Sequence, residues 1–306
     1  MKKPAVLICG HGSRDTDAIE EFKNFVGSIE EKIPDRQVGY GFLEFASPTI
    51  GEKLIKMRDL GINNVEAVPG MLFAAGHAKN DIPSVLNNFI AENKEFIINY
   101  GRELAIHPKI LAASCARIEE AESTCKTKIN RKDTLLLVVG RGTSDPDANS
   151  NISKITRILW EGMGFGWAET AYTGVTFPLI GPALERILLL GFKRIIVFPY
   201  FLFTGVLVKR IYTTIDELQD SRPDVFILKA KYLSNHPLVV EGFLDRLKEI
   251  SLGENLMNCQ LCKYREQIIG YENDKGSPQI GHHHHVEGIG TDHNSHNHHS
   301  RKTNEN

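Results

Sequence analysis

The sequence is poor in cysteine, in long apolar runs and in excess charge, and each shortage excludes a class of protein. Its five cysteines are an odd number without the spacing of a disulfide framework, which indicates a reducing compartment and a cytoplasmic location. No apolar run reaches the roughly 18 residues that a membrane helix needs, and the apolar stretch after the first lysines is too short for a signal peptide. With 36 basic and 38 acidic residues, the net charge is −2 and the pI about 6.6, which favours neither nucleic acid nor a membrane surface.

Nucleotide-binding motifs are also missing. The loop 10–15, Gly-His-Gly-Ser-Arg-Asp, has the glycines of a phosphate-binding turn. It lacks the full dinucleotide fingerprint and the lysine of a P-loop. We therefore expect a reaction that does not use ATP.

What the chain does contain is an internal repeat at an offset of 130 residues. The run Val6–Asp15 aligns without a gap with Leu136–Asp145. The same offset superimposes further pairs of backbone-shaping, apolar or basic residues: Pro48 and Pro178, Gly61 and Gly191, Pro69 and Pro199, Phe73 and Phe203, Lys79 and Lys209. The repeat predicts two domains, 1–130 and 131–252, followed by a tail, 253–306.

Each copy alternates short apolar runs with amphipathic stretches, which is typical of βαβ units and a parallel sheet. We expect two tandem flavodoxin-like α/β domains facing each other across a cleft. The predicted strands lie near residues 5–9, 38–45, 65–72 and 103–107, and near 135–139, 168–175, 194–201 and 225–230. The predicted helices of the first copy lie at about 15–32, 48–60, 78–99 and 109–128.

Several residues are expected at helix ends. Glycine suits the C-cap position, proline suits the first turn, and a histidine before a proline opens a helix more readily than it binds a metal. These predictions concern Gly61 and Gly191, Pro48 and Pro178, and His107 and His236.

Three metal-capable side chains follow the first three strands of the first copy. They are His11, Glu44 and His77, and the second copy has Arg141, Gly174 and Leu207 in their places. Taken singly, each residue fits a structural role better than ligation. Taken together, they end successive parallel strands at one rim, where such sheets bind ligands, and all three are lost in the duplicate. Two imidazoles and a carboxylate suit a divalent first-row metal and leave coordination positions open.

The tail has a different composition. Met257-Asn-Cys-Gln-Leu-Cys262 is followed by a stretch that holds eight of the twelve histidines. Such a segment is not expected to fold without a metal or a partner, and its histidines would store or buffer metal.

These motifs resemble those of the class II chelatases of modified-tetrapyrrole synthesis, especially the long sirohydrochlorin cobaltochelatases of cobalamin synthesis. The resemblance rests on Gly-His-Gly-Ser-Arg, on Glu44 followed by Ala-Ser-Pro-Thr, on Pro-Gly-Met-Leu-Phe-Ala-Ala-Gly-His77 and on the Met-x-Cys-x-x-Cys motif, and it covers nearly the whole chain. It implies that His11, Glu44 and His77 bind cobalt(II) as the substrate metal and insert it into sirohydrochlorin. Because that ring carries many carboxylates, we expect cations at the rim: Arg14, Lys79, Arg141, Lys209 and Arg210.

The resemblance also implies a [4Fe-4S] cluster at Cys259 and Cys262. Two thiolates are too few for a cubane, which normally takes four, so either two chains share a cluster in a homodimer or other residues complete it. A zinc site is the simpler alternative. Two other functions compete with cobalt insertion. One is insertion of iron or nickel, because ligand chemistry does not separate these metals. The other is a bilobal metal-binding or metallochaperone protein that is not an enzyme.

Overall fold

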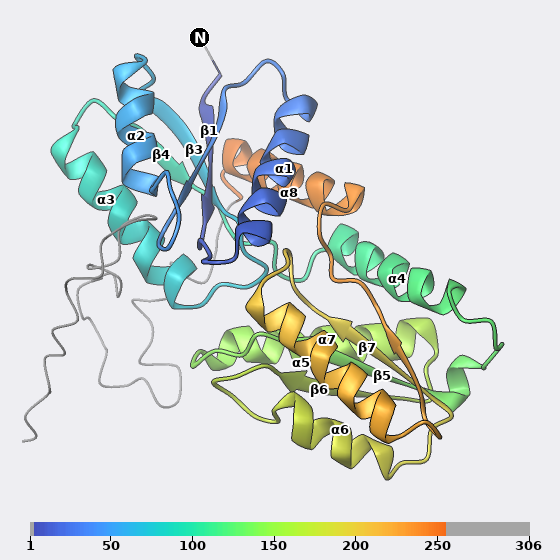
Figure 1. Ribbon diagram of the computed structural model, residues 1–306. Coiled ribbons are helices and arrows are strands. Elements are labelled where there is room, and N and C mark those ends of the chain that lie inside the picture. The colour runs from blue at the N-terminus through green and yellow to red at the C-terminus, as the bar shows by residue number, and fades with distance from the viewer. Residues whose placement is uncertain (1–2, 255–306) are drawn as a thin grey trace, which may run out of the picture.

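The computed structural model describes residues 3–254, which form two α/β halves of the same design (Figure 1). Each half has a four-stranded parallel sheet, with the orders β2-β1-β3-β4 and β6-β5-β7-β8. The strands are β1 (Ala5–Gly10), β2 (Val38–Phe42), β3 (Asn64–Pro69), β4 (Ile97–Tyr100), β5 (Thr134–Gly140), β6 (Trp167–Tyr172), β7 (Arg194–Pro199) and β8 (Phe226–Lys229). This confirms the predicted tandem parallel α/β fold.

Helices cover both faces of each sheet, so every residue of the central strands β1 and β5 is buried. The α-helices are α1 (Thr16–Lys32), α2 (Ile50–Asp59), α3 (Ile82–Glu92), α4 (Pro108–Ser123), α5 (Pro146–Met163), α6 (Ile180–Leu188), α7 (Val206–Ser221) and α8 (Pro237–Leu252). A π-helix (His77–Asp81) precedes α3, and a 3-10 turn (Arg131–Asp133) precedes β5. None of the helices within residues 3–254 is long and apolar enough to span a membrane.

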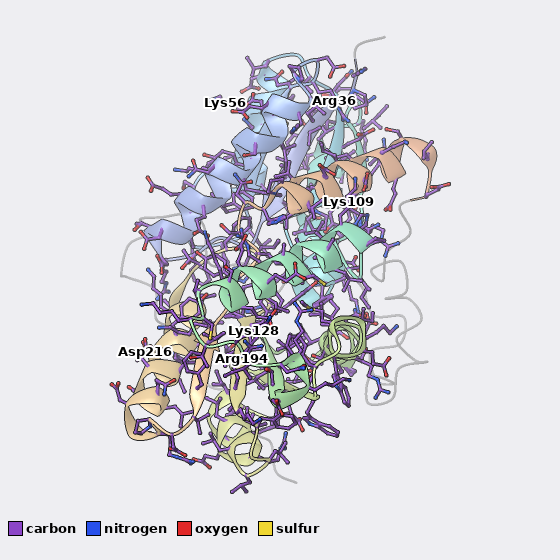
Figure 2. All side chains as sticks on the ribbon, turned by 90° about the vertical axis from the view of Figure 1, so that its right-hand side faces the viewer. Arg36, Lys56, Lys109, Lys128, Arg194 and Asp216 are labelled. Carbon is purple, nitrogen blue, oxygen red and sulfur yellow. The ribbon has the colours of Figure 1, made fainter. Side chains whose placement is uncertain are left out.

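The last helix of each half packs against the other half. Helix α8 contacts α1 and β3, whereas α4 contacts α5, β7 and β8, and the two helices contact each other (Figure 1). The ring centroids of Phe25 in α1 and Phe243 in α8 are 5.0 Å apart. Lys109 of α4, labelled in Figure 2, forms an ion pair with Asp245 of α8, with 2.7 Å between Nζ and Oδ2. The two halves thereby share one apolar cluster. A cut at residue 130 would leave each sheet without the helix that covers part of one face.

The predicted fourth strand at 103–107 is wrong, because β4 is Ile97–Tyr100. Within the described residues, β4 pairs with β3 alone, and its residues alternate between exposed and half-buried. It therefore lacks the apolar run of a buried strand, and the helix predicted at 78–99 covered most of it. Residues 103–107, around the buried Leu104, form a loop.

The predicted helix ends are mostly confirmed. His107 and His236 are N-caps whose Nδ1 atoms accept from the backbone N–H of Lys109 and Leu238, both at 3.2 Å. Gly61 and Gly191 have φ of +76° and +69° just beyond their helices. The two prolines, Pro48 and Pro178, instead lie two residues before helices that begin at Ile50 and Ile180.

Candidate metal site

Three adjacent strands bring the predicted ligands together. His11 follows β1, Glu44 follows β2, and His77 begins the π-helix beyond β3. Because the sheet order is β2-β1-β3, the chain leaves these strands at one edge. One ligand atom from each residue lies within 4.8 Å of those of the other two. Glu44 is 2% exposed, while the two histidines are half-buried and open to solvent.

A glycine makes the approach of His11 to Glu44 possible. Gly12 has φ +94°, and a Cβ there would lie 1.7 Å from the Glu44 carbonyl oxygen. The Glu44 N–H donates to the His11 carbonyl oxygen at 3.0 Å, which fixes the two loops to each other. A residue with a side chain would push them apart.

Both imidazoles turn the same nitrogen toward the centre of the site. His11 Nδ1 lies 2.9 Å from the Gly12 carbonyl oxygen, and His77 Nδ1 lies 2.8 Å from Asp81 Oδ2. Each Nδ1 faces an acceptor, so in the neutral form of each imidazole Nδ1 carries the proton and Nε2 keeps the lone pair that can bind a metal. The two Nε2 atoms are 3.1 Å apart, and His11 Nε2 is 3.1 Å from Glu44 Oε1. Two nitrogens bound to one ion at about 2.0–2.1 Å would have nearly this separation.

Asp81 is a further candidate site residue, which the sequence analysis did not single out. It is 1% exposed, contacts His77 one helical turn away, and accepts a hydrogen bond from Asn80 Nδ2 at 3.1 Å. The repeat contained the signal that could have revealed it, because the position corresponding to Asp81 is Ile211. Asp81 is therefore lost in the second copy together with the three predicted ligands.

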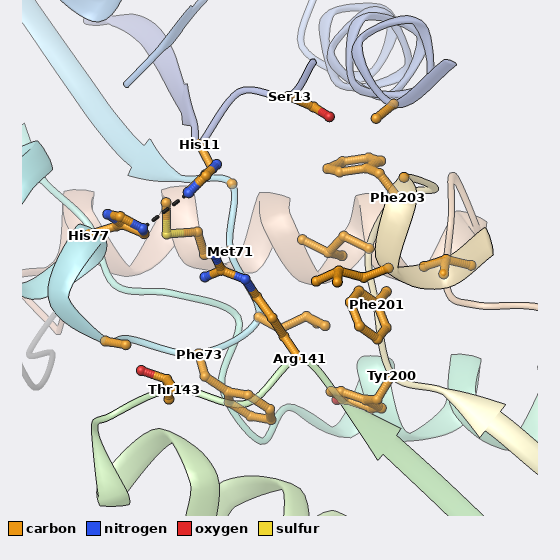
Figure 3. A pocket seen from close by; sticks show the side chains of 18 of the residues that line it. His11, Ser13, Met71, Phe73, His77, Arg141, Thr143, Tyr200, Phe201 and Phe203 are labelled. Carbon is orange, nitrogen blue, oxygen red and sulfur yellow. Dashed lines mark hydrogen bonds between the residues drawn. The ribbon is translucent and has the colours of Figure 1, made fainter. Parts of the chain in front are cut away.

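The site opens into a cavity of about 410 Å³ between the two halves. Its wall is rich in aromatic side chains, namely Phe22, Phe42, Phe73, Tyr200, Phe201 and Phe203. Phe73 and Tyr200, one from each half, stack at 5.6 Å with an interplanar angle of 14°. Figure 3 shows His11 and His77 on one side of this space and the aromatic rings on the others. Such a wall suits a flat conjugated ligand with polar edges.

Arg141 occupies in the second half the position that His11 has in the first. Its guanidinium group reaches across the cavity toward the two histidines (Figure 3). Desolvation lowers the pKa of Arg141 below its ordinary value, and the nearby Glu44 carboxylate opposes part of this shift. An arginine keeps its charge through such shifts, so Arg141 brings a positive charge into the cavity near the Glu44 carboxylate.

The other predicted cations lie elsewhere. Of the five cations predicted to bind the substrate, Arg141 is the one that lines the cavity in the described part of the chain. Lys79 and Lys209 form ion pairs with the opposite half, Arg14 lies over the Phe45 ring at 5.0 Å, and Arg210 is exposed on α7. Cys259 and Cys262 lie outside the described residues.

The fold and the site together define a two-domain parallel α/β protein with a candidate metal site, His11, Glu44 and His77, beside an aromatic cavity. The CbiX family model matches this chain twice, over residues 5–121 and 135–250, so the chain belongs to the CbiX family. The two matches coincide with the two copies of the repeat. Together with the chelatase relatives described next, they confirm the resemblance to class II chelatases.

Curated relatives cover most of the chain. A sirohydrochlorin cobaltochelatase of Priestia megaterium is 35% identical over 266 residues, which are 87% of this chain and 86% of that protein. A sirohydrochlorin ferrochelatase of the same organism is 30% identical over 76% of this chain and 85% of its own. Among solved structures, SirB from Bacillus subtilis with Fe3+ has a TM-score of 0.71 at 26% identity, covering 83% of this chain and 98% of that one. SirB of the subspecies spizizenii in complex with cobalt has a TM-score of 0.69 at 26% identity, covering 82% and 96%.

Proposed function

We propose that this protein is a sirohydrochlorin chelatase and that it inserts cobalt(II) without ATP. The observation that carries the proposal is the His11–Glu44–His77 cluster, whose two Nε2 lone pairs converge 3.1 Å apart at the edge of the aromatic cavity. A metal held there is presented to a flat ring bound in the cavity, which supplies the proximity that transfer requires.

The proposed reaction balances in protons. Insertion places a divalent ion on the ring nitrogens and releases two N–H protons from the ring. As the metal leaves, the Nε2 atoms of His11 and His77 become free to accept protons, and the buried Glu44 carboxylate stabilises the charge that develops. Asp81 keeps the His77 proton on Nδ1, so Nε2 stays available throughout.

Arg141 is the residue proposed to orient the substrate. Its cation lies in the cavity, and sirohydrochlorin is rich in carboxylates, with which a guanidinium forms bidentate hydrogen bonds. Arg14 and Arg210 remain predictions as further carboxylate partners. The two lysines, Lys79 and Lys209, face the opposite half instead of the cavity.

Cobalt is the metal that we favour over iron and nickel. The 35% identical relative is a cobaltochelatase, whereas the relatives at 30% and 28% identity are ferrochelatases. The test is anaerobic incubation of the full chain with sirohydrochlorin and one metal at a time, followed by the change in ring absorbance. Fastest insertion of Co²⁺ at limiting metal supports the proposal, and faster insertion of Fe²⁺ or Ni²⁺ would reassign the metal.

We also propose that Cys259 and Cys262 bind an iron–sulfur cluster shared by two chains in a homodimer. Of the other cysteines, Cys9 is fully buried in β1, and burial holds its thiol pKa far above the usual range, which makes it a poor ligand. Anaerobically purified protein should be brown, and Cys259→Ser should bleach it and weaken self-association. Colourless protein with stoichiometric zinc would reject the cluster and leave the chelatase proposal standing. The cytoplasmic location remains a prediction.

A further inference from the structure

Two ion pairs related by the repeat connect the halves. Lys79 Nζ lies 2.6 Å from Asp145 Oδ2 and 3.0 Å from Asp147 Oδ2. In the symmetric arrangement, Lys209 Nζ lies 2.8 Å from carboxylate oxygens of both Asp15 and Asp17. Each lysine comes two residues after the third ligand position of its half, which is a histidine in the first half and a leucine in the second.

The two pairs differ in burial. The difference lies mainly in the lysines, since the Lys79 side chain is 4% exposed and the Lys209 side chain is 52% exposed. The partners of Lys79 are Asp145, 15% exposed, and Asp147, 37% exposed, whereas those of Lys209 are Asp15, 8% exposed, and Asp17, 66% exposed. An exposed ion pair contributes little, because water and salt screen it. Removing one member of a buried pair leaves an uncompensated charge and perturbs the structure around it. The Lys79 pair is therefore the stronger constraint on the positions of the two halves.

Lys79 joins the metal ligands to the wall of the cavity. It lies in the π-helix between His77 and Asp81, and its N–H donates to the Ala75 carbonyl oxygen at 2.8 Å. Its partner Asp145 ends the loop that begins at Arg141. Asp145 is itself fixed as the N-cap of α5, since Oδ1 accepts from the Asp147 N–H at 3.0 Å.

We propose that Lys79 is a positioning residue that makes the metal site of the first half depend on the second half. The buried ion pair holds the π-helix so that His77 Nε2 faces His11, and it sets the distance between that helix and the Arg141 loop. The degenerate half therefore does more than enclose the substrate, because it helps to shape the site that binds the metal. This inference rests on the proposed role of His11, Glu44 and His77 as metal ligands.

The experiment is an anaerobic Co²⁺ titration of the full chain, read from the ligand-field absorption of bound cobalt. His77→Ala gives the baseline, because the eight tail histidines also take up metal. Lys79→Met should weaken the affinity of the His77-dependent site about tenfold or more, as the loss of supporting residues does at other metal sites, and should change its spectrum. The matched control Lys209→Met should change the affinity by less than about twofold, because the Lys209 side chain is half exposed and water screens its charge.

A second pair of variants covers the case in which Lys79→Met does not fold. Asp147→Asn removes one of the two carboxylates from Lys79, and Asp17→Asn does the same for Lys209. Asp147→Asn should weaken cobalt binding more than Asp17→Asn does.

Equal effects within each matched pair would overturn the inference, as would a folded Lys79→Met with wild-type affinity and spectrum. Failure of the proposed function has a separate signature: wild-type protein that shows the His77-dependent cobalt spectrum but inserts no metal into sirohydrochlorin rejects the function alone. Wild-type binding no stronger than the His77→Ala baseline rejects both.

Discussion

Substituting alanine for Gly12 should separate the fold from the chemistry, because the second copy offers a matched control. Gly12 and Gly142 occupy the same position of the repeat, with φ of +94° and +84°. A Cβ at Gly12 would lie 1.7 Å from the Glu44 carbonyl oxygen, and a Cβ at Gly142 would lie 2.0 Å from that of Gly174. Both substitutions therefore strain the backbone and push the facing loop outward, but Gly12 faces the predicted metal ligand Glu44, whereas Gly142 faces Gly174.

The magnitude follows from these distances. Non-glycine residues held in unfavourable backbone regions cost about 1–3 kcal/mol each. A loss of about 2 kcal/mol lowers Tm by roughly 4–8 °C in a chain of this size. Real Cβ contacts stay beyond 3.0 Å, so Gly12→Ala must move the Glu44 carbonyl by about 1.3 Å. Metal–ligand distances tolerate about 0.2 Å, and a misplacement of about 1 Å can reduce a rate about 100-fold.

Thermal unfolding, the insertion rate and the His77-dependent Co²⁺ affinity, all measured on the full chain, test this reasoning. Both variants should lose comparable stability, and at a temperature where both are folded Gly12→Ala should lose about 100-fold in insertion together with Co²⁺ affinity. Gly142→Ala should keep the wild-type Co²⁺ affinity, because its loop carries Arg141 but no predicted metal ligand. Wild-type insertion by Gly12→Ala would refute the reasoning, and an equal loss of Co²⁺ affinity in Gly142→Ala would show that the effect is general destabilisation.

Further predictions concern the surroundings of the site. Asp81→Asn should weaken metal binding about 10- to 100-fold with little change in Tm, and ¹⁵N NMR should show His77 losing its single tautomer; an unchanged tautomer would contradict the assigned role. Burial and the nearby Arg246 lower the pKa of His107 below its usual value, so the unfolded chain takes up the proton first and stability is lost as the pH falls from about 6.5. His107→Asn keeps a capping side chain that does not titrate, and urea unfolding at pH 7.5 and 5.5 should show a smaller acid loss than in the wild type; an identical loss would exclude His107 as its source. A chain that ends at residue 254 should stay folded and insert metal, since α8 completes the first half's core before that point; an insoluble or inactive product in excess metal would assign the tail a structural or catalytic role.

The repeat made most of the fold readable from the sequence. A gapless alignment of two βα loops predicts two equal α/β units, and the loss of His11, Glu44 and His77 from the second copy singles them out among the polar residues. Local capping chemistry was equally readable, as His107 and His236 show. These features depend on residues close in sequence or on comparison of the two copies.

Properties that depend on packing between the halves were not readable. Helices α4 and α8 each pack against the opposite half, which depends on contacts such as that of Phe25 with Phe243, more than 200 residues apart in the sequence. An amphipathic helix has the same local sequence pattern whichever half it packs against. The ion pairs of Lys79 and Lys209 with the opposite half were equally hidden, because a basic residue near a predicted ligand has the same sequence signature whether it faces a cavity or an aspartate of the other half. The edge strand β4 lacked the buried apolar run of a central strand.

The central claim is that His11, Glu44 and His77 hold the metal that enters the ring. Its most direct test is the anaerobic insertion of Co²⁺ into sirohydrochlorin by the wild type and by His77→Ala, with circular dichroism to verify that both are folded. We expect the ring absorbance of the cobalt product to develop with the wild type, and to develop no faster with His77→Ala than without protein. Insertion by a folded His77→Ala at the wild-type rate would contradict it.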